Sequence, residues 1–352
     1  MNSEIAQVRT GEELDTGRLA AYLHRCLPGS GGAIEVAQFP GGHSNLVYLI
    51  RAGGVEYVLR RPPLGPVPPR AHDMAREFRV LDAVYPHFPE APRAILLCED
   101  PAVVGAPFFL MERRHGVVLR DAAPSEWAAI PDYPRVASEA FIDCLVRLHQ
   151  VDISLPPLRA LGKPAGFVAR QVRGWAERWQ QAKTEELPEM DRVILWLLDR
   201  VPASPAATLV HNDFKLDNVM MRPTADRVEA VLDWEMTTLG DPLADLGLTL
   251  CYWTWACIAS RDDPHPATPV ITAGAGWFTR DEFVNRYARR TGLDVSGLGY
   301  YEALGIFKLA VILQQIYFRF HRGQTRDERF RDFDRRVRGL VLLAGRMVER
   351  QG

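Results

Sequence analysis

One short stretch of the chain combines polar side chains at fixed offsets with apolar segments. His211, Asp213, Lys215 and Asn218 follow the pattern H-x-D-x-K-x-x-N, and Asp233 comes fifteen residues after Asn218. An apolar pair directly precedes the pattern, and an apolar run that reads as a strand directly precedes the later aspartate. Side chains at the ends of rigid elements hold fixed positions. The fold must therefore present both aspartates from ordered elements.

These residue types suit phosphoryl transfer from a magnesium nucleotide. Asp213 can accept or orient a substrate hydroxyl, because this reaction needs positioning and charge neutralisation more than a strong base. Lys215 can neutralise charge that develops on the transferred phosphate. Asn218 and Asp233 offer the hard oxygen ligands that Mg²⁺ prefers. The alternative is that Asp213 and Asn218 only form a loop and a turn, which both residue types favour.

Composition excludes several classes of protein. The 352 residues carry 42 basic and 44 acidic side chains, a net charge of -2, so neither a nucleic acid nor a membrane surface is an expected partner. Five scattered cysteines without a C-x-x-C pair indicate neither disulfides nor zinc. The amino terminus lacks a signal-peptide layout, and the most apolar run, Leu246 to Ala259, spans only 14 residues. We expect a cytoplasmic monomer or homodimer.

Periodicity divides the chain into a strand-rich part and a helical part. We expect an α+β fold in which a five-stranded antiparallel sheet with one helix, preceded by a lead-in helix, forms an N-terminal nucleotide-binding domain over residues 1–113. The mainly helical catalytic and substrate-binding domain then covers residues 114–352. The predicted strands are Ile34 to Phe39, Leu46 to Arg51, Val55 to Arg60, Ile95 to Cys98 and Pro107 to Glu112, and the predicted helices are Asp15 to Cys26 and Ala71 to Tyr85.

Several segments of the sequence resemble one family. HNDFKLDN, VLDWE and TLGDPLADL are similar to the aminoglycoside phosphotransferase and choline kinase-like family, and to its branch related to the N-terminal, kinase-like part of some acyl-CoA dehydrogenases. YVLRRPPLG and RQVRGWAERW resemble the same branch, so the similarity covers nearly the whole chain. The resemblance implies a bilobal protein-kinase-like fold that uses ATP and Mg²⁺, with Asp213 as the catalytic aspartate.

The resemblance also implies roles for residues of the N-terminal domain. Arg60 stands on the third strand, where it would present a positive charge to the phosphates in place of the lysine usual in protein kinases. Glu77 would be its ion-pair partner, although an exposed helix charge explains this residue equally well. Glu112 and its neighbours would form the hinge beside adenine.

The turn between the first two predicted strands is rich in glycine. Gly41, Gly42 and Ser44 could let backbone amides approach phosphates, because glycine permits close contact. The turn lacks the full G-x-G-x-x-G pattern, and a plain hairpin explains it equally well.

The function predicted from these residues is ATP- and magnesium-dependent transfer of the γ-phosphate to a hydroxyl of a small molecule. The branch suggests a hydroxylated acyl chain or a hydroxyacyl-CoA as the acceptor. Two alternatives stay open: an aminoglycoside or other antibiotic O-phosphotransferase, and a pseudokinase that binds nucleotide or ligand without chemistry. The aromatic run Cys251 to Trp255 either lines the acceptor pocket or packs in the core of a helix.

Overall fold

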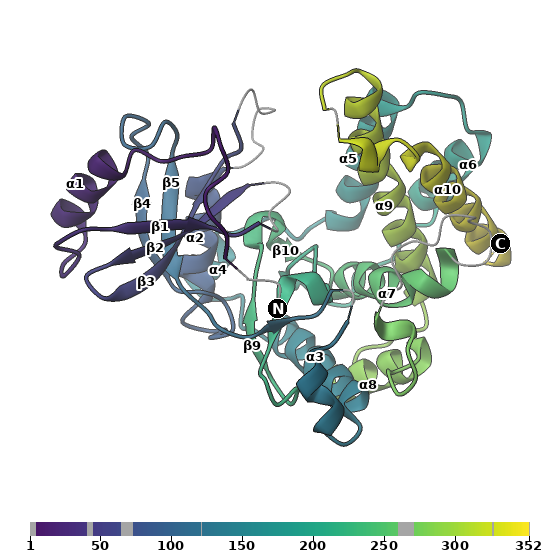
Figure 1. The fold of residues 1–352 in the computed structure, drawn as a ribbon. Coiled ribbons are helices and arrows are strands. Elements are labelled where there is room, and N and C mark those ends of the chain that lie inside the picture. Colours follow the sequence, from purple (N-terminus) through teal and green to yellow (C-terminus); the bar gives the residue numbers. More distant parts are fainter. Residues whose placement is uncertain are drawn as a thin grey trace. The chain divides into compact units, whose positions relative to one another are not determined.

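The computed structural model describes residues 5–40, 45–64, 73–120, 122–259, 271–325 and 327–351, with the side chains of residues 255–259 outside this description. The chain forms two compact units (Figure 1). The first consists of residues 1–116 and 229–235, and the second of residues 117–228 and 236–352. The sequence placed the division at residue 113 and did not anticipate that residues 229–235 return to the first unit.

The first unit contains a five-stranded sheet in the order β1-β2-β3-β5-β4, and every neighbouring pair is antiparallel. The predicted five-stranded antiparallel sheet is therefore confirmed. The strands are β1 (Glu35–Gln38), β2 (Leu46–Ala52), β3 (Val55–Arg61), β4 (Ala94–Cys98) and β5 (Phe108–Glu112).

Two helices pack against this sheet, and each begins at an aspartate cap. The side chain of Asp15 accepts a hydrogen bond from the Arg18 amide at the start of α1 (Thr16–Cys26). Asp73 accepts one from the Arg76 amide at the start of α2 (Met74–Val84), which explains why this helix begins later than predicted.

Strand alternation assigns the two helices to opposite faces of the sheet (Figure 1). Leu19 and Leu23 of α1 belong to one buried cluster with Phe108 and Leu110 of β5. Phe109, between them on β5, contacts Phe78 of α2 edge to face instead. The α2 face is also the face on which Arg60 meets Glu77.

Residues 229–235 join the first unit through contacts with the segment after α2. They comprise most of β9 (Val228–Val231) and the residues that follow it. The Val231 amide donates to the Glu90 carbonyl at 2.8 Å, and the Trp234 ring contacts the Phe88 ring edge to face. These contacts bring Asp233, with a left-handed φ of 67°, into the same unit as Arg60.

The second unit is mainly helical, as predicted. Its longer helices are α3 (Tyr133–His149), α5 (Phe167–Ala182), α6 (Pro188–Asp199), α7 (Pro242–Ala259), α8 (Arg280–Thr291), α9 (Leu298–His321) and α10 (Phe333–Arg350). Its strands are β6 (Val117–Val118), β7 (Thr208–Val210), β8 (Val219–Met221) and β10 (Thr238–Gly240), and β7 pairs with β10 while β6 pairs with β8. The proline-rich stretch from Ser154 to Pro164 is not wholly a loop, because it contains the short helix α4 (Pro156–Arg159).

Helix α9 packs against α5, α7 and α10 (Figure 1). Within the described part of the chain it is the one helix long and apolar enough to cross a bilayer, and more than half of its most apolar window is buried inside the protein. Its close approach to α7 depends on two glycines. A Cβ atom on Gly247 would lie 2.6 Å from the Tyr301 backbone, and one on Gly305 would lie 2.7 Å from the Cys251 sulfur.

We predict that Gly247→Ala destabilises the protein by about 2 kcal/mol, because α7 and α9 must separate to admit one methyl group. Denaturant unfolding measures this change. The matched control is Gly339→Ala in α10, where a Cβ atom meets no atom within 4 Å; there the better helix former should stabilise by about 0.5 to 1 kcal/mol. Equal effects of the two substitutions would refute the close-packing explanation.

Candidate active site

Arg60 lies at the centre of a buried charge cluster in the first unit. Its Nε lies 3.0 Å from a Glu77 oxygen, and its Nη2 lies 2.6 Å from Asp233 Oδ1 and 3.5 Å from Glu235 Oε2. Glu77 is only 2% exposed, so the predicted ion pair with Arg60 is present and the exposed-charge alternative is wrong. The side chains of Asp233 and Glu235 remain about one quarter exposed.

The cluster contains more negative than positive charge. Burial opposes the charge on Arg60, but the carboxylates of Glu77, Asp233 and Glu235 raise its pKa above the ordinary value. Burial raises the pKa of Glu77, and Asp233 and Glu235 raise it further against the opposing effect of Arg60. One guanidinium thus faces three carboxylates, and a divalent cation at the exposed carboxylates would offset the excess.

This donor set fits a magnesium ion that is shared with a nucleotide. In the described part of the chain, no group of three or more His, Cys, Asp or Glu side chains could hold a metal ion by itself. Mg²⁺ at phosphoryl-transfer sites is commonly bound by one or two protein oxygens together with phosphate oxygens and water. Asp233 can supply one such oxygen because its side chain contacts Arg60 through Oδ1 and stays 27% exposed.

Glu112, predicted to lie beside adenine, ends β5 and is fixed by local contacts. Its carboxylate accepts a hydrogen bond from the Arg93 amide at 2.7 Å and lies 2.7 Å from Arg114 Nη2. Its own amide donates to the Arg93 carbonyl at 3.0 Å. The predicted phosphate-binding residues Gly41, Gly42 and Ser44 lie outside the described residues.

In the second unit, the H-x-D-x-K-x-x-N pattern forms a loop between β7 and β8 that is anchored by Asp245 of α7. Asp245 Oδ2 accepts a hydrogen bond from the His211 amide at 2.7 Å, and Oδ1 accepts one from the Asn212 amide at 2.8 Å. His149 Nε2 lies 3.2 Å from the same Oδ2. Burial disfavours the charge on Asp245, yet these hydrogen bonds hold its pKa below the ordinary value.

Asn212, directly before Asp213, is fixed in a left-handed conformation with φ of 65°. Its amide donates to Asp245, and its side chain donates to the Met236 carbonyl at 3.1 Å. Its carbonyl accepts from Lys308 Nζ of α9 at 2.7 Å. Contacts from three separate segments therefore set the direction in which the chain enters Asp213.

The Asp213 carboxylate is oriented by donors on both of its oxygens. Asn218 Nδ2 donates to Oδ2 at 2.8 Å and to the Asp213 carbonyl at 2.9 Å, and Lys215 Nζ lies 3.0 Å from the same Oδ2. The Tyr252 hydroxyl donates to Oδ1 at 2.9 Å. Because Asn218 uses its amide nitrogen for Asp213, its side-chain oxygen is the atom suited to a metal ion.

The structure brings Asp213, Lys215 and Asn218 together, and it adds residues that the sequence did not assign to the site. The sequence named Tyr252 only within an aromatic run, and it did not name Lys308, which lies in an apolar stretch of α9. A basic residue within that apolar stretch of α9 was the one available signal for Lys308. Asp241 caps the helix that begins at Pro242, because Asp241 Oδ1 accepts a hydrogen bond from the Leu243 amide at 2.9 Å.

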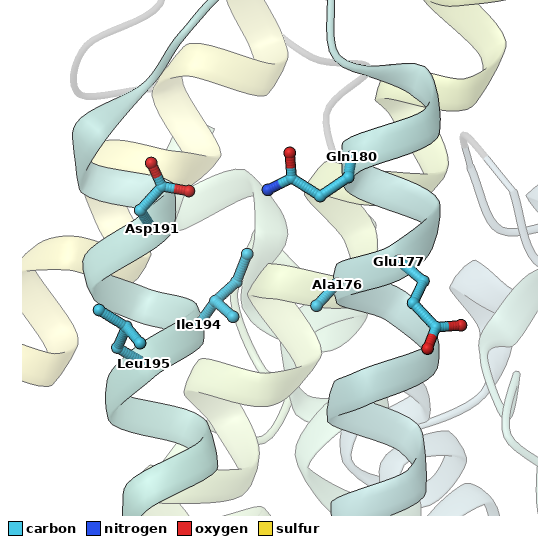
Figure 2. Close-up of a pocket in the computed structure, with 6 residues that line it drawn as sticks. All are labelled: Ala176, Glu177, Gln180, Asp191, Ile194 and Leu195. Carbon is cyan, nitrogen blue, oxygen red and sulfur yellow. The ribbon is translucent and has the colours of Figure 1, made fainter.

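A shallow groove of about 430 Å³ lies between α5 and α6. Figure 2 shows Glu177 and Gln180 on α5 and Asp191 and Leu195 on α6 around it. The predicted site residues are not among the described residues that line this groove. It therefore adds nothing to the catalytic loop.

Lys308 predicts a pH dependence of stability. Burial lowers its pKa to about 8, so the folded protein loses this proton at lower pH than the unfolded chain, whose lysine titrates near 10.5. The unfolded state then holds more protons between these values, and the free energy of unfolding should rise with pH by up to about 1.4 kcal/mol per pH unit relative to Lys308→Met.

Urea unfolding of both proteins from pH 7 to pH 10 measures this difference. Lys163→Met, at an exposed lysine of the same unit, is the control and should show no such divergence. Parallel pH profiles for the wild-type protein and Lys308→Met would show that burial does not destabilise the charged Lys308 ammonium.

Comparison with known proteins identifies the family. Residues 35–283 match the model of the phosphotransferase enzyme family. Acyl-CoA dehydrogenase family member 11 of Gallus gallus is 32% identical over 351 residues, which cover 96% of this chain and 44% of that protein. The predicted relation to a part of the acyl-CoA dehydrogenases is thus confirmed, and the chain spans less than half the length of this relative.

Solved structures of phosphotransferases are similar to this chain as well. A Ralstonia eutropha protein, provisionally named an aminoglycoside phosphotransferase, superposes with a TM-score of 0.79 at 30% identity and covers 96% of this chain and 99% of its own. An aminoglycoside phosphotransferase solved with AMP-PNP and hygromycin B has a TM-score of 0.60 at 17% identity over 93% of this chain and 97% of its own, and shows the shared fold. The chain belongs to the phosphotransferase enzyme family.

Proposed function

We propose that this chain transfers the γ-phosphate of ATP to a hydroxyl group of a small molecule, with Asp213 accepting the hydroxyl proton. The observation that carries this proposal is the orientation of the Asp213 carboxylate by Asn218, Lys215 and Tyr252. As the hydroxyl oxygen bonds to the γ-phosphorus, the bond to ADP breaks and the hydroxyl proton passes to Asp213. Such positioning supplies most of the catalysis in this class of reaction.

The other predicted residues serve the nucleotide in this proposal. Lys215, next to Asp213, offsets charge on the transferred phosphate, and Arg60 offers a buried cation of the first unit. Asn218 of the second unit and Asp233 of the first unit each offer a side-chain oxygen of the kind that Mg²⁺ prefers. When bound, the ion neutralises phosphate charge and orients the phosphates. The AMP-PNP complex of the structural relative supports ATP as the donor.

For the acceptor we propose a hydroxylated acyl chain, carried as a hydroxyacyl-CoA. This proposal is supported by the match to an acyl-CoA dehydrogenase family member, a protein named for acyl-CoA chemistry. The match covers 96% of this chain at 32% identity. An aminoglycoside is the second candidate, favoured by the 30% identity to the Ralstonia eutropha protein. The pseudokinase alternative is disfavoured because Asp213, Lys215 and Asn218 are all present and mutually hydrogen bonded or paired.

An acceptor screen tests the proposal. The protein is incubated with Mg-ATP and each member of a panel of hydroxyacyl-CoAs, aminoglycosides and short amino alcohols, and mass spectrometry detects the gain of one phosphate. Modification of a hydroxyacyl-CoA supports the proposed acceptor. Modification of aminoglycosides alone would replace it with the second candidate, and nucleotide binding without any modified acceptor would favour the pseudokinase.

We predict that Asp213→Ala lowers kcat by about a thousandfold, because the hydroxyl loses both its proton acceptor and its orientation. Affinity for Mg-ATP, measured by calorimetry, should stay nearly unchanged. Asp199→Ala removes an exposed aspartate at the end of α6 and should leave both quantities at wild-type values. Wild-type turnover of Asp213→Ala would exclude Asp213 as the proton acceptor.

We predict that Asp233→Asn weakens binding of Mg-ATP but has less effect on ATP with EDTA, because the amide is a poorer ligand than the carboxylate. Calorimetric titrations with and without Mg²⁺ measure the difference. Asp213→Ala serves as the control and should keep the magnesium dependence. An equal loss of affinity under both conditions would assign Asp233 to the organisation of Arg60 rather than to the metal.

A further inference from the structure

The two oxygens of Asp213 have different surroundings. Oδ2 accepts from Asn218 at 2.8 Å and lies 3.0 Å from Lys215 Nζ, whereas Oδ1 accepts the Tyr252 hydroxyl at 2.9 Å. A carboxylate oxygen accommodates about two donors. Oδ2 is therefore filled by residues of its own loop, and Oδ1 retains capacity for one further donor.

Tyr252 contacts Lys215 as well. The Lys215 ammonium lies 4.9 Å from the centre of the Tyr252 ring, within the range of a cation–π interaction. One side chain thus contacts two of the loop residues that the proposed chemistry uses, with its hydroxyl on Asp213 and its ring against Lys215.

The position of Tyr252 follows from the fold of α7. Asp245, which binds the His211 and Asn212 amides, precedes Tyr252 by two helical turns and so shares its face of the helix. Helix α7 therefore holds the backbone of the loop through Asp245 and its side chains through Tyr252.

The Tyr252 phenol acts as a donor. Its burial, followed by the charge of Asp213, raises its pKa well above the ordinary value. A neutral hydroxyl that donates to Oδ1 stabilises the ionised carboxylate without neutralising it.

We infer that Tyr252 is a positioning residue, which fixes the rotamer of Asp213 so that Oδ1 receives the acceptor hydroxyl and which holds Lys215 against its ring. This inference rests on the proposed phosphotransfer. A donor such as Tyr252 on Oδ1 keeps the carboxylate from turning about its Cβ–Cγ bond. The acceptor proton then always meets the same oxygen.

Two substitutions separate the roles of the hydroxyl and the ring. Tyr252→Phe keeps the ring and should lower kcat about tenfold or more, because it removes a hydrogen bond to a charged group, while KM for ATP stays unchanged. Tyr252→Leu should lower kcat further because Lys215 is also released. The assays use Mg-ATP with the acceptor that gains phosphate in the screen.

The matched control is Tyr300→Phe. Tyr300 is buried in the second unit, and its hydroxyl likewise donates one hydrogen bond, to the Leu197 carbonyl at 2.7 Å. In thermal unfolding, Tyr300→Phe should lose about as much stability as Tyr252→Phe, but it should keep the wild-type kcat. A kcat loss equal to that of Tyr252→Phe would show a general effect of losing a buried hydroxyl, and wild-type kcat in Tyr252→Phe would overturn the inference.

A second readout needs neither ATP nor an acceptor. Reductive methylation of Lys215, followed by peptide mass spectrometry, should be faster in Tyr252→Leu than in the wild-type protein and unchanged in Tyr252→Phe. Equal rates in all three proteins would refute the contact between Lys215 and the ring. Absence of turnover in the wild-type protein would refute the proposed function itself, and the methylation rates would then decide the positioning contact alone.

Discussion

The catalytic loop depends on one buried carboxylate, that of Asp245. It accepts the amides of His211 and Asn212 and lies against His149, and its side chain is fully buried. Without it, two buried amide donors would lack partners, and each unpaired donor costs about 1 to 3 kcal/mol, more than a typical hydrogen bond contributes. The conformation of the chain before Asp213 is thus set by helix α7, a tertiary element, and the loop's own sequence has only to be compatible with it.

Helix α9 also fixes the catalytic loop, through polar side chains on the face that packs against α7. Gly305 lets α9 approach α7 closely, and on the same face Tyr301 donates to Asp241 at 2.7 Å while Lys308 donates to the Asn212 carbonyl. The three residues follow one another at intervals of about one turn. The packing of two apolar helices therefore determines where polar groups meet the loop, so helix packing and loop geometry are coupled.

The sequence predicted the features that are encoded locally. Strand alternation and glycine turns gave the five-stranded sheet, and the spacing of Asp213, Lys215 and Asn218 gave a loop whose members do contact one another. Tyr252 and Lys308 were missed because their contacts join positions 39 and 96 residues apart. Each lies in an apolar helix whose periodicity indicates burial, and periodicity alone does not tell which buried polar group faces the loop.

The surroundings of position 60 also explain why it holds an arginine and not a lysine. A lysine ammonium is a compact point charge, whereas a guanidinium presents donors in a planar fork. Arg60 uses Nε for Glu77 and Nη2 for Asp233 and Glu235, so its two sides meet carboxylates from α2 and from the segment after β9. The longer, forked cation of Arg60 therefore contacts a third carboxylate, that of Glu235. With three carboxylates around one guanidinium, the cluster keeps an excess of negative charge where magnesium is proposed to bind.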